Sequence, residues 1–335
     1  MNAELDARVR PAFEGREVLV TGGLGFIGST LARRLVPMGA RVTLVDSLVP
    51  EYGGNRFNLA GLEDRVRVNI SDVRDPHSMT TLIRGQHYLF NLAGQTSHLD
   101  SMEDPATDLE INCRAQLSIL EACRRHDPQV RVVFASTRQI YGRPEYLPVD
   151  EKHPLKPVDV NGINKIAGES YHLVYHDVYG IRASSLRLTN TIGPRMRVKD
   201  ARQTFLGIWV RRILEGKPFE VWEGDQLRDF TDVEDCVDAL LLAATEDAAS
   251  GRCFNLGGLE RVSLKDLAAR LVAAAGEGTY ETKSFPAERK RIDIGDYWSD
   301  WSAIRDALGW RPRTPLDDTL RRTIEYYRTH REHYW

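Results

Sequence analysis

The stretch Thr21-Gly-Gly-Leu-Gly-Phe-Ile-Gly28 decides how this chain folds. It follows Glu17-Val-Leu-Val20, a short apolar run that predicts a strand. It precedes Ser29–Val36, an amphipathic run that predicts a helix, with Pro37 and Gly39 to end it. Glycines in such a turn permit a sharp reversal and close packing of the helix on the strand. The stretch therefore predicts the first strand and helix of a βαβ unit.

The glycines of this turn that fall three residues apart are Gly22, Gly25 and Gly28. They let the backbone approach a pyrophosphate, which would meet the free N–H groups of the helix that begins near Phe26. The next predicted strand, Arg41–Val45, is followed by Asp46. A carboxylate there accepts hydrogen bonds from ribose hydroxyls and repels a 2′-phosphate. The turn predicts a dinucleotide site that favours NAD over NADP.

Apolar runs alternate with amphipathic runs as far as residue 190. Further strands are predicted at 65–70, 88–93, 131–135 and 181–188, and long helices at 104–126 and 159–179. Such alternation implies parallel strands with helices on both faces of the sheet. With right-handed crossovers, the sequence predicts an α/β fold with a doubly wound parallel (Rossmann) sheet.

The pattern changes after Asn190. The segment Gly193–Gln203 predicts a loop. Helices are predicted beyond it at 204–215, 233–245, 263–275, 300–308 and 316–328, with strands at 219–222 and 253–256. We therefore predict an NAD-binding domain over 1–190 and a smaller α/β substrate domain over 191–335, partly interleaved with the first.

Composition and charge exclude several classes of protein. The 335 residues include 45 Lys+Arg against 48 Asp+Glu, a net charge of −3, whereas a nucleic-acid binder needs a basic surplus. No run reaches the roughly 18 apolar residues of a membrane helix. The segment Met1–Gly15 lacks the apolar core of a secretory signal, and the four cysteines lack metal-ligand spacing. We expect a cytoplasmic protein without metal, membrane or nucleic-acid partner.

Short motifs along nearly the whole chain resemble the extended short-chain dehydrogenase/reductase superfamily, in particular its nucleotide-sugar epimerases, dehydratases and decarboxylases. The motifs are TGGLGFIG at 21–28, Asp72-Val73, Asn91-Leu-Ala-Gly94, Asn112, Ser-Thr-Arg-Gln-Ile-Tyr-Gly at 136–142, Lys165 with Ala167-Gly168-Glu169, Asn190, Gly193-Pro194-Arg195, Arg228-Asp229-Phe230 with Asp232-Val233, and Leu308-Gly309-Trp310. The resemblance implies an enzyme that binds NAD and a nucleotide sugar. It also implies a homodimer built on the helices at 104–126 and 159–179.

The resemblance implies roles for the matching residues. Lys165 would hydrogen-bond the nicotinamide ribose, and Thr137 would bind the 4-oxygen of the sugar. The other implied cofactor residues are Gly22, Gly25, Phe26, Ile27, Gly28, Asp46, Ser47, Asp72, Val73, Leu92, Ala93, Gly94 and Asn112. Asn190 and Arg228, with Arg291 as a weaker candidate, would hold the diphosphate of the substrate, because a guanidinium fork pairs with phosphate oxygens.

One position departs from the pattern of the family. The family carries a Tyr four residues before the Lys, on the same helix face, and its tyrosinate takes the proton of a sugar hydroxyl. Here that position holds Asn161. A carboxamide orients a hydroxyl or a water but does not act as a base. The candidate catalytic residues are therefore Thr137, Asn161 and Lys165.

Three interpretations remain open. In the first, the chain is an NAD-dependent epimerase that oxidises a sugar carbon, with C4 favoured, and returns the hydride. Its base would then be Tyr141, Tyr171, His98, Lys165 or a water held by Asn161. In the second, the substrate arrives as a ketone and needs no base. In the third, the chain binds NAD or a nucleotide sugar without catalysis.

The residues after Thr137 narrow the subclass. Arg138-Gln139 stands where the 4,6-dehydratases of the family carry Asp-Glu, so we do not expect water elimination by that route. The decarboxylases carry Glu at the position of Gln139. The stretches Gly193–Met196 and Asp200–Arg202 nevertheless resemble the decarboxylase substrate loop, which leaves decarboxylase-like binding open.

Overall fold

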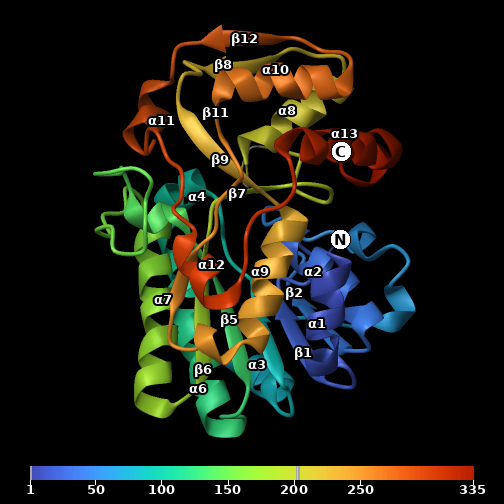
Figure 1. The fold of residues 1–335 in the computed structure, drawn as a ribbon, viewed down its shortest axis with the longest axis vertical. Helices are drawn as coiled ribbons and strands as arrows, with labels where there is room; N and C mark the ends of the chain where they lie inside the picture. Colours follow the sequence, from blue (N-terminus) through green and yellow to red (C-terminus); the bar gives the residue numbers. More distant parts are fainter. Residues whose placement is uncertain (1, 201, 203) are drawn as a thin grey trace.

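Seven strands form the central sheet of the molecule (Figure 1). The computed structural model describes residues 2–200, 202 and 204–335, so Met1 of the predicted first domain and Ala201 and Gln203 of the predicted loop lie outside the described residues. The strands of this sheet are β1 (Glu17–Thr21), β2 (Arg41–Asp46), β3 (Arg67–Ile70), β4 (Tyr88–Asn91), β5 (Arg131–Thr137), β6 (Arg182–Leu188) and β10 (Cys253–Asn255). Each pairs in parallel with its neighbours, which confirms the doubly wound α/β fold.

The strand order is β10-β6-β5-β4-β1-β2-β3. The chain moves outward from β1 in one direction through β2 and β3, then returns and continues in the other direction from β4. β1 pairs with both β2 and β4 and therefore lies at the point of reversal. Ligands of open α/β sheets bind outside the carboxyl ends of the strands at this point.

Helices cover both faces of the sheet (Figure 1). One face carries α1 (Ala3–Phe13), α2 (Phe26–Leu35) and α9 (Val233–Thr245), which share one apolar core cluster. The other face carries α3 (Pro76–Ile83), α6 (Ala115–His126) and α7 (Val160–Tyr179), which contribute to a second cluster. The sequence analysis did not anticipate α1, although its buried residues Leu5, Val9 and Phe13 recur at helical spacing.

The helix predicted at 104–126 has three parts. It runs through α5 (Pro105–Leu109), a π-helical turn at Glu110–Arg114 and α6. A π-turn widens the helix locally and is frequent at functional sites. Here the turn contains the buried Asn112, whose side chain reaches toward the loop that follows β4.

The chain beyond residue 190 builds two small sheets. One contains β7 (Asn190–Ile192), β9 (Leu227–Asp232) and β11 (Arg261–Ser263), and the other contains β8 (Phe219–Trp222) and β12 (Tyr280–Lys283). Their helices are α8 (Phe205–Leu214), α10 (Leu264–Ala275) and α13 (Leu316–His330), and α11 (Ala287–Arg291) and α12 (Ser302–Leu308) follow β12. The strands β7, β9, β11 and β12 are not among those predicted from the sequence. Because α9 and β10 return to the first sheet, the chain crosses more than once between the two parts.

No helix among the residues that the structure describes is long and apolar enough to cross a membrane. Within the same residues, no group of three or more His, Cys, Asp or Glu is arranged to hold a metal ion.

Candidate active site

The glycine turn joins the end of β1 to α2. Gly22 has a φ of 67°, a left-handed conformation that favours glycine. A Cβ on Gly28 would overlap the carbonyl oxygen of Gly22, so only glycine fits there. Gly25 precedes the helix without a capping side chain, which leaves the N–H groups of the first helical turn free for a ligand. This cradle fits a pyrophosphate.

Two acidic residues lie at the ends of neighbouring strands beside this turn. The carboxylate of Asp46 accepts hydrogen bonds from the backbone N–H groups of Leu24 at 3.0 Å and Leu48 at 2.9 Å, and burial raises its pKa. Asp72 forms an ion pair with Arg74 at 2.6 Å, and the hydrogen bond from Arg74 lowers the pKa of Asp72. Both line the pocket that contains the turn. We call this part of the pocket the turn end.

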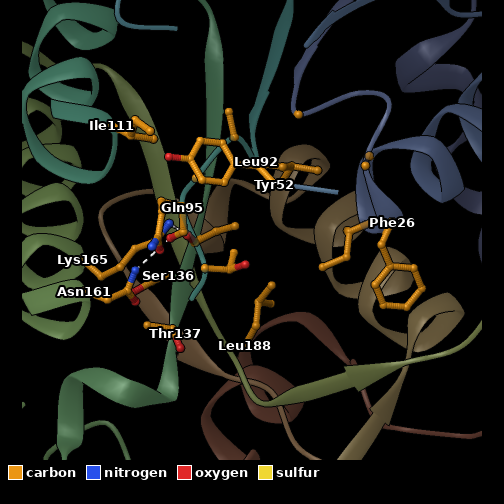
Figure 2. Close-up of a pocket in the computed structure, with 18 of the residues that line it drawn as sticks. Phe26, Tyr52, Leu92, Gln95, Ile111, Ser136, Thr137, Asn161, Lys165 and Leu188 are labelled. Atoms are coloured by element: carbon orange, nitrogen blue, oxygen red, sulfur yellow. Dashed lines mark hydrogen bonds between the residues drawn. The ribbon is translucent and has the colours of Figure 1, made fainter. Parts of the chain in front are cut away.

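The opposite part of the pocket, which we call the Lys165 end, gathers Gln95, Ser136, Thr137, Asn161 and Lys165 (Figure 2). The Nζ of Lys165 donates to the carbonyl oxygen of Ala135 at 3.0 Å and lies 4.9 Å from the centroid of the Phe134 ring. Burial lowers the pKa of Lys165 to about 8. Lys165 can therefore hold or release a proton close to neutral pH.

Asn161 is held in place by hydrogen bonds to two remote residues. Its Nδ2 donates to the carbonyl oxygen of Gln95 at 2.8 Å and to Oδ2 of Asp108 at 3.0 Å. The other oxygen of Asp108 accepts from Nδ2 of Asn164 at 2.8 Å. An amide carries only two N–H donors, so both are used. Only the carbonyl oxygen of Asn161 remains to accept a hydrogen bond from a ligand.

Neither tyrosine considered as a replacement base lines the pocket. The hydroxyl of Tyr141 donates to Oδ1 of Asn255 at 2.6 Å and accepts from Nη1 of Arg187 at 2.6 Å. Burial raises the pKa of Tyr141. Tyr171 packs, half-buried, against the apolar cluster on its face of the sheet.

His98, in contrast, lines the pocket. It is the first residue of α4 (His98–Glu103), and its Nδ1 lies 2.9 Å from Oδ2 of the buried Asp159. Asp159 also accepts hydrogen bonds from the N–H of Gly162 at 2.7 Å and from Nε2 of Gln139 at 3.0 Å. Burial opposes ionisation of Asp159, but its contact with His98 and these hydrogen bonds outweigh that effect and lower its pKa.

Arg138 brings a guanidinium to the pocket wall. Its Nη2 donates to Oδ1 of Asn190 at 3.0 Å, whereas its buried Nη1 has no hydrogen-bond partner among the described residues. Burial lowers the pKa of Arg138. An unpartnered buried N–H group costs free energy that an anionic ligand would recover. The sequence analysis weighed Arg138 only as a residue that is not an acid.

Three predicted site residues do not line the pocket. Asn112 lies behind it, where its Nδ2 donates to the carbonyl oxygen of Gln95 at 2.9 Å. The guanidinium of Arg228 is buried and lies 3.2 Å from Asp293, and both burial and the nearby charge of Arg138 lower its pKa to about 10. Arg291 is exposed on α11.

The predicted residues that the structure gathers in the pocket wall are Gly22, Gly25, Phe26, Ile27, Gly28, Asp46, Ser47, Asp72, Val73, Leu92, Ala93, Gly94, Thr137, Asn161, Lys165 and Asn190. Those that sequence reasoning did not assign include Tyr52, Gln95, Thr96, Ser136, Arg138, Gln139 and Thr204. Ser136 and Arg138 could have been identified from the sequence, because they lie just after the carboxyl end of a predicted parallel strand, where ligands of such sheets bind. No local pattern pointed to Tyr52 or Thr204.

The chain is similar to known proteins over most of its length. The model of the NAD dependent epimerase/dehydratase family matches residues 18–257. The chain is 30% identical to a putative UDP-glucose 4-epimerase of Methanocaldococcus jannaschii over 316 residues, which cover 92% of this chain and 97% of that protein.

Two solved structures show the same fold. The UDP-glucose 4-epimerase of Thermotoga maritima, solved with UDP-glucose, has a TM-score of 0.84 at 28% identity and covers 94% of this chain and 99% of its own. The UDP-glucuronic acid 4-epimerase of Bacillus cereus, solved with UDP-glucuronic acid and NAD, has a TM-score of 0.83 at 26% identity, with the same coverage of 94% and 99%. From the family match and the relatives together, the chain belongs to the NAD-dependent epimerase/dehydratase family of nucleotide-sugar enzymes.

Proposed function

We propose that this protein is an NAD-dependent epimerase that oxidises one carbon of a nucleotide sugar, with C4 favoured, and returns the hydride to the other face. The observation that carries the proposal is one pocket that joins the glycine turn to Thr137 and Lys165. The relatives named as UDP-glucose 4-epimerases support the reaction class.

The residues of the turn end would hold the dinucleotide. The free N–H groups at the start of α2 would bind its pyrophosphate, and Asp46 would accept hydrogen bonds from its adenosine ribose. Lys165 would donate to the nicotinamide ribose, because its ammonium has only one hydrogen-bond partner, the Ala135 carbonyl, among the described residues. Bound NAD supplies the acceptor for the hydride of the sugar.

The Lys165 end would orient the sugar. The hydroxyl of Thr137 would bind the 4-oxygen in either oxidation state, because a hydroxyl both donates and accepts. The carbonyl oxygen of Asn161 would accept from a sugar hydroxyl, since its amide hydrogens are engaged by Gln95 and Asp108. Asn161 thus has a positioning role in place of the acid–base role of the family tyrosine.

The anionic part of the substrate would bind at Arg138. This guanidinium lines the pocket with a free Nη1, while Arg228 is turned toward Asp293. Asn190 would hold Arg138 in place and contact the substrate beside it. A buried guanidinium that binds an anion forms a charge-assisted hydrogen bond, which is stronger than a neutral one.

The experiment that tests this function uses the purified protein and a panel of nucleotide sugars. Products are identified by NMR, and NADH absorbance follows the oxidised sugar intermediate. We expect inversion at one sugar carbon and a transient NADH signal. Absence of both across the panel would overturn the proposal.

A second function is favoured by one observation, the replacement of the family base by Asn161 in a site that is otherwise complete. A non-catalytic binder would hold NAD or a nucleotide sugar tightly in calorimetry without turnover. The same panel distinguishes the two functions. Decarboxylation has less support, because Gln139 is a carboxamide bound to Asp159.

A further inference from the structure

The family base has no direct replacement at its own position. The amide hydrogens of Asn161 are committed, and Tyr141 and Tyr171 lie outside the pocket. Asp46 and Asp72 line the pocket at the turn end, away from Thr137. Tyr52 also lines the pocket, but burial raises its pKa, which disfavours the tyrosinate. Among the described residues that line the Lys165 end, this leaves His98 and Lys165 itself to take up a proton.

His98 has the surroundings of a general base. Its side chain is 38% exposed, while the carboxylate of Asp159 that it contacts at Nδ1 is fully buried. Nδ1 and Oδ2 of that carboxylate are within hydrogen-bonding distance, although the ring is not oriented to donate to Asp159 in this structure, so Nδ1 has no hydrogen-bond partner among the described residues. A small rotation of the ring would let Nδ1–H donate to the carboxylate, and a carboxylate that accepts at one ring nitrogen fixes the tautomer and leaves a lone pair on the other.

Asp159 is itself rigidly held. Its side chain caps the start of α7 through the N–H of Gly162 and accepts from Gln139. Asn161 lies on the first turn of the same helix, two residues beyond Asp159. The helix start that carries Asn161 at the family position therefore also positions His98.

We propose that His98, held by Asp159, takes the proton of the substrate hydroxyl in place of the missing tyrosine. This inference rests on the proposed epimerase function. The hydroxyl O–H bond would break and its proton would go to Nε2 of His98; bound NAD would supply the acceptor for the hydride of the same carbon, which becomes a carbonyl. In the return step, the carbonyl oxygen regains the proton from His98 and the carbon regains the hydride. No net oxidation or reduction results.

Lys165 is less suited to this task. Although burial lowers the pKa of Lys165 to about 8, its Nζ donates to the Ala135 carbonyl and faces the Phe134 ring, and both contacts favour the ammonium form. A cation is also the form that donates to ribose hydroxyls. In this proposal His98 takes the proton of the sugar hydroxyl, the role of the family tyrosine, and Lys165 binds the nicotinamide ribose, the role of the family lysine.

The first test compares His98→Gln with His77→Gln, a change at an exposed histidine of α3. General-base catalysis contributes typically 10²–10⁴-fold, so we expect His98→Gln to lower kcat at least about 100-fold. Affinity for NAD, measured by calorimetry, should stay within about twofold because His98 lies away from the turn end. His77→Gln should keep the activity of the wild type. Equal turnover by His98→Gln and the wild type would overturn the inference.

The second test concerns Asp159 as a positioning residue. Asp159→Asn keeps an oxygen to cap α7, and it removes the charge beside His98 together with the acceptor for Nε2 of Gln139. We expect kcat to fall about 10- to 100-fold with KM nearly unchanged, because the imidazolium loses its counter-charge. A change confined to KM would contradict the assigned role.

A third measurement does not depend on turnover. The 15N spectrum of the histidine side chains is recorded for the full-length protein with NAD, before and after addition of UDP-glucose. We expect the Nε2 resonance of His98 to shift and Nδ1 to remain protonated. No shift under saturating UDP-glucose would overturn the inference. If the wild type turns over no sugar but the shift is present, the epimerase function fails and the contact of His98 with substrate stands.

Discussion

The two ends of the pocket bind their ligands with different parts of the chain. At the turn end, backbone N–H groups and tightly packed glycines form the surface, and Asp46 is fixed by two backbone N–H donors. At the Lys165 end, side chains form the surface, and Arg138, Asn161 and His98 contact side chains or carbonyls that are remote in sequence. The first end therefore tolerates few substitutions, while the second can exchange one acid–base group for another without a change of fold.

Both ends disfavour unpaired charge. Burial raises the pKa of Asp46 at the turn end and lowers that of Lys165 at the other. His172 follows the same rule: its ring stacks on Phe134 at a centroid distance of 4.4 Å, and burial lowers its pKa to about 4. Such a low-dielectric environment strengthens each hydrogen bond that a ligand makes in it.

Gly28→Ala should have the largest effect on NAD affinity and on stability, because it disrupts the turn end, whose surface is formed by the backbone. The new methyl group would overlap the carbonyl oxygen of Gly22, so the turn must open. We expect NAD affinity to fall at least about 100-fold and the free energy of unfolding to drop by about 2–4 kcal/mol. Calorimetry and thermal unfolding measure the two. Gly61→Ala, where no atom lies within 4 Å but φ is 81°, should lose some stability and leave NAD affinity unchanged; an equal loss of NAD affinity in both variants would contradict this account.

Acid should destabilise the folded protein through His172, which lies outside the pocket and stacks on the same Phe134 ring that Lys165 faces. His172 has a pKa of about 4 in the folded protein against an ordinary value of 6.5 for histidine, so between these values the unfolded chain binds the additional proton. The stabilisation is complete above pH 6.5 and is lost as the pH falls toward 4, by about 2–3 kcal/mol in all. Denaturant unfolding from pH 7 to pH 4 measures it. His172→Gln removes this titration, and a slope as steep as that of the wild type would refute the assignment.

Arg138→Gln should separate the ligands of the two ends. Loss of one charge-assisted hydrogen bond weakens nucleotide-sugar binding by about 1.5–3 kcal/mol, or roughly 10- to 100-fold. NAD affinity should be unaffected, because Arg138 lies at the opposite end from the turn. Calorimetry with UDP, UDP-glucose and UDP-glucuronic acid measures the change, and Arg114→Gln, at an exposed arginine with an i,i+4 partner, is the control. A loss for UDP-glucuronic acid alone would assign Arg138 to a sugar carboxylate, and unchanged binding of all three would remove it from the site.

A substitution on the outer face of α7 is expected to have the smallest effect on ligand binding in the pocket. Val174 and Val178 are exposed there, with Ile163 on the same helix, and we propose that a second copy of the chain covers them in a homodimer. Val178→Lys should shift the protein from dimer to monomer in size-exclusion chromatography with light scattering, and NAD affinity should change less than about twofold. A monomeric wild type would refute the homodimer.

The residues of the turn end were predictable because their contacts are local. Gly22, Gly28 and Asp46 belong to one βαβ unit. Gly22 has a left-handed φ, and a side chain on Gly28 would overlap the carbonyl oxygen of Gly22. Lys165 and Thr137 were predictable from motifs at a strand end and on a helix. The sequence alone therefore predicted the doubly wound fold, the residues of the turn end and Asn161 at the position where the resemblance implies a tyrosine.

Only the tertiary structure decided what stands beside Asn161. Its partners Gln95 and Asp108 are 66 and 53 residues away in sequence, and no periodicity links them. The same holds for His98 with Asp159 and for Arg228, which pairs with Asp293 across 65 residues and so faces away from the pocket. Whether a buried polar group serves a ligand or a neighbour depends on which partner fills its hydrogen-bonding capacity, and that partner is chosen by packing between distant segments.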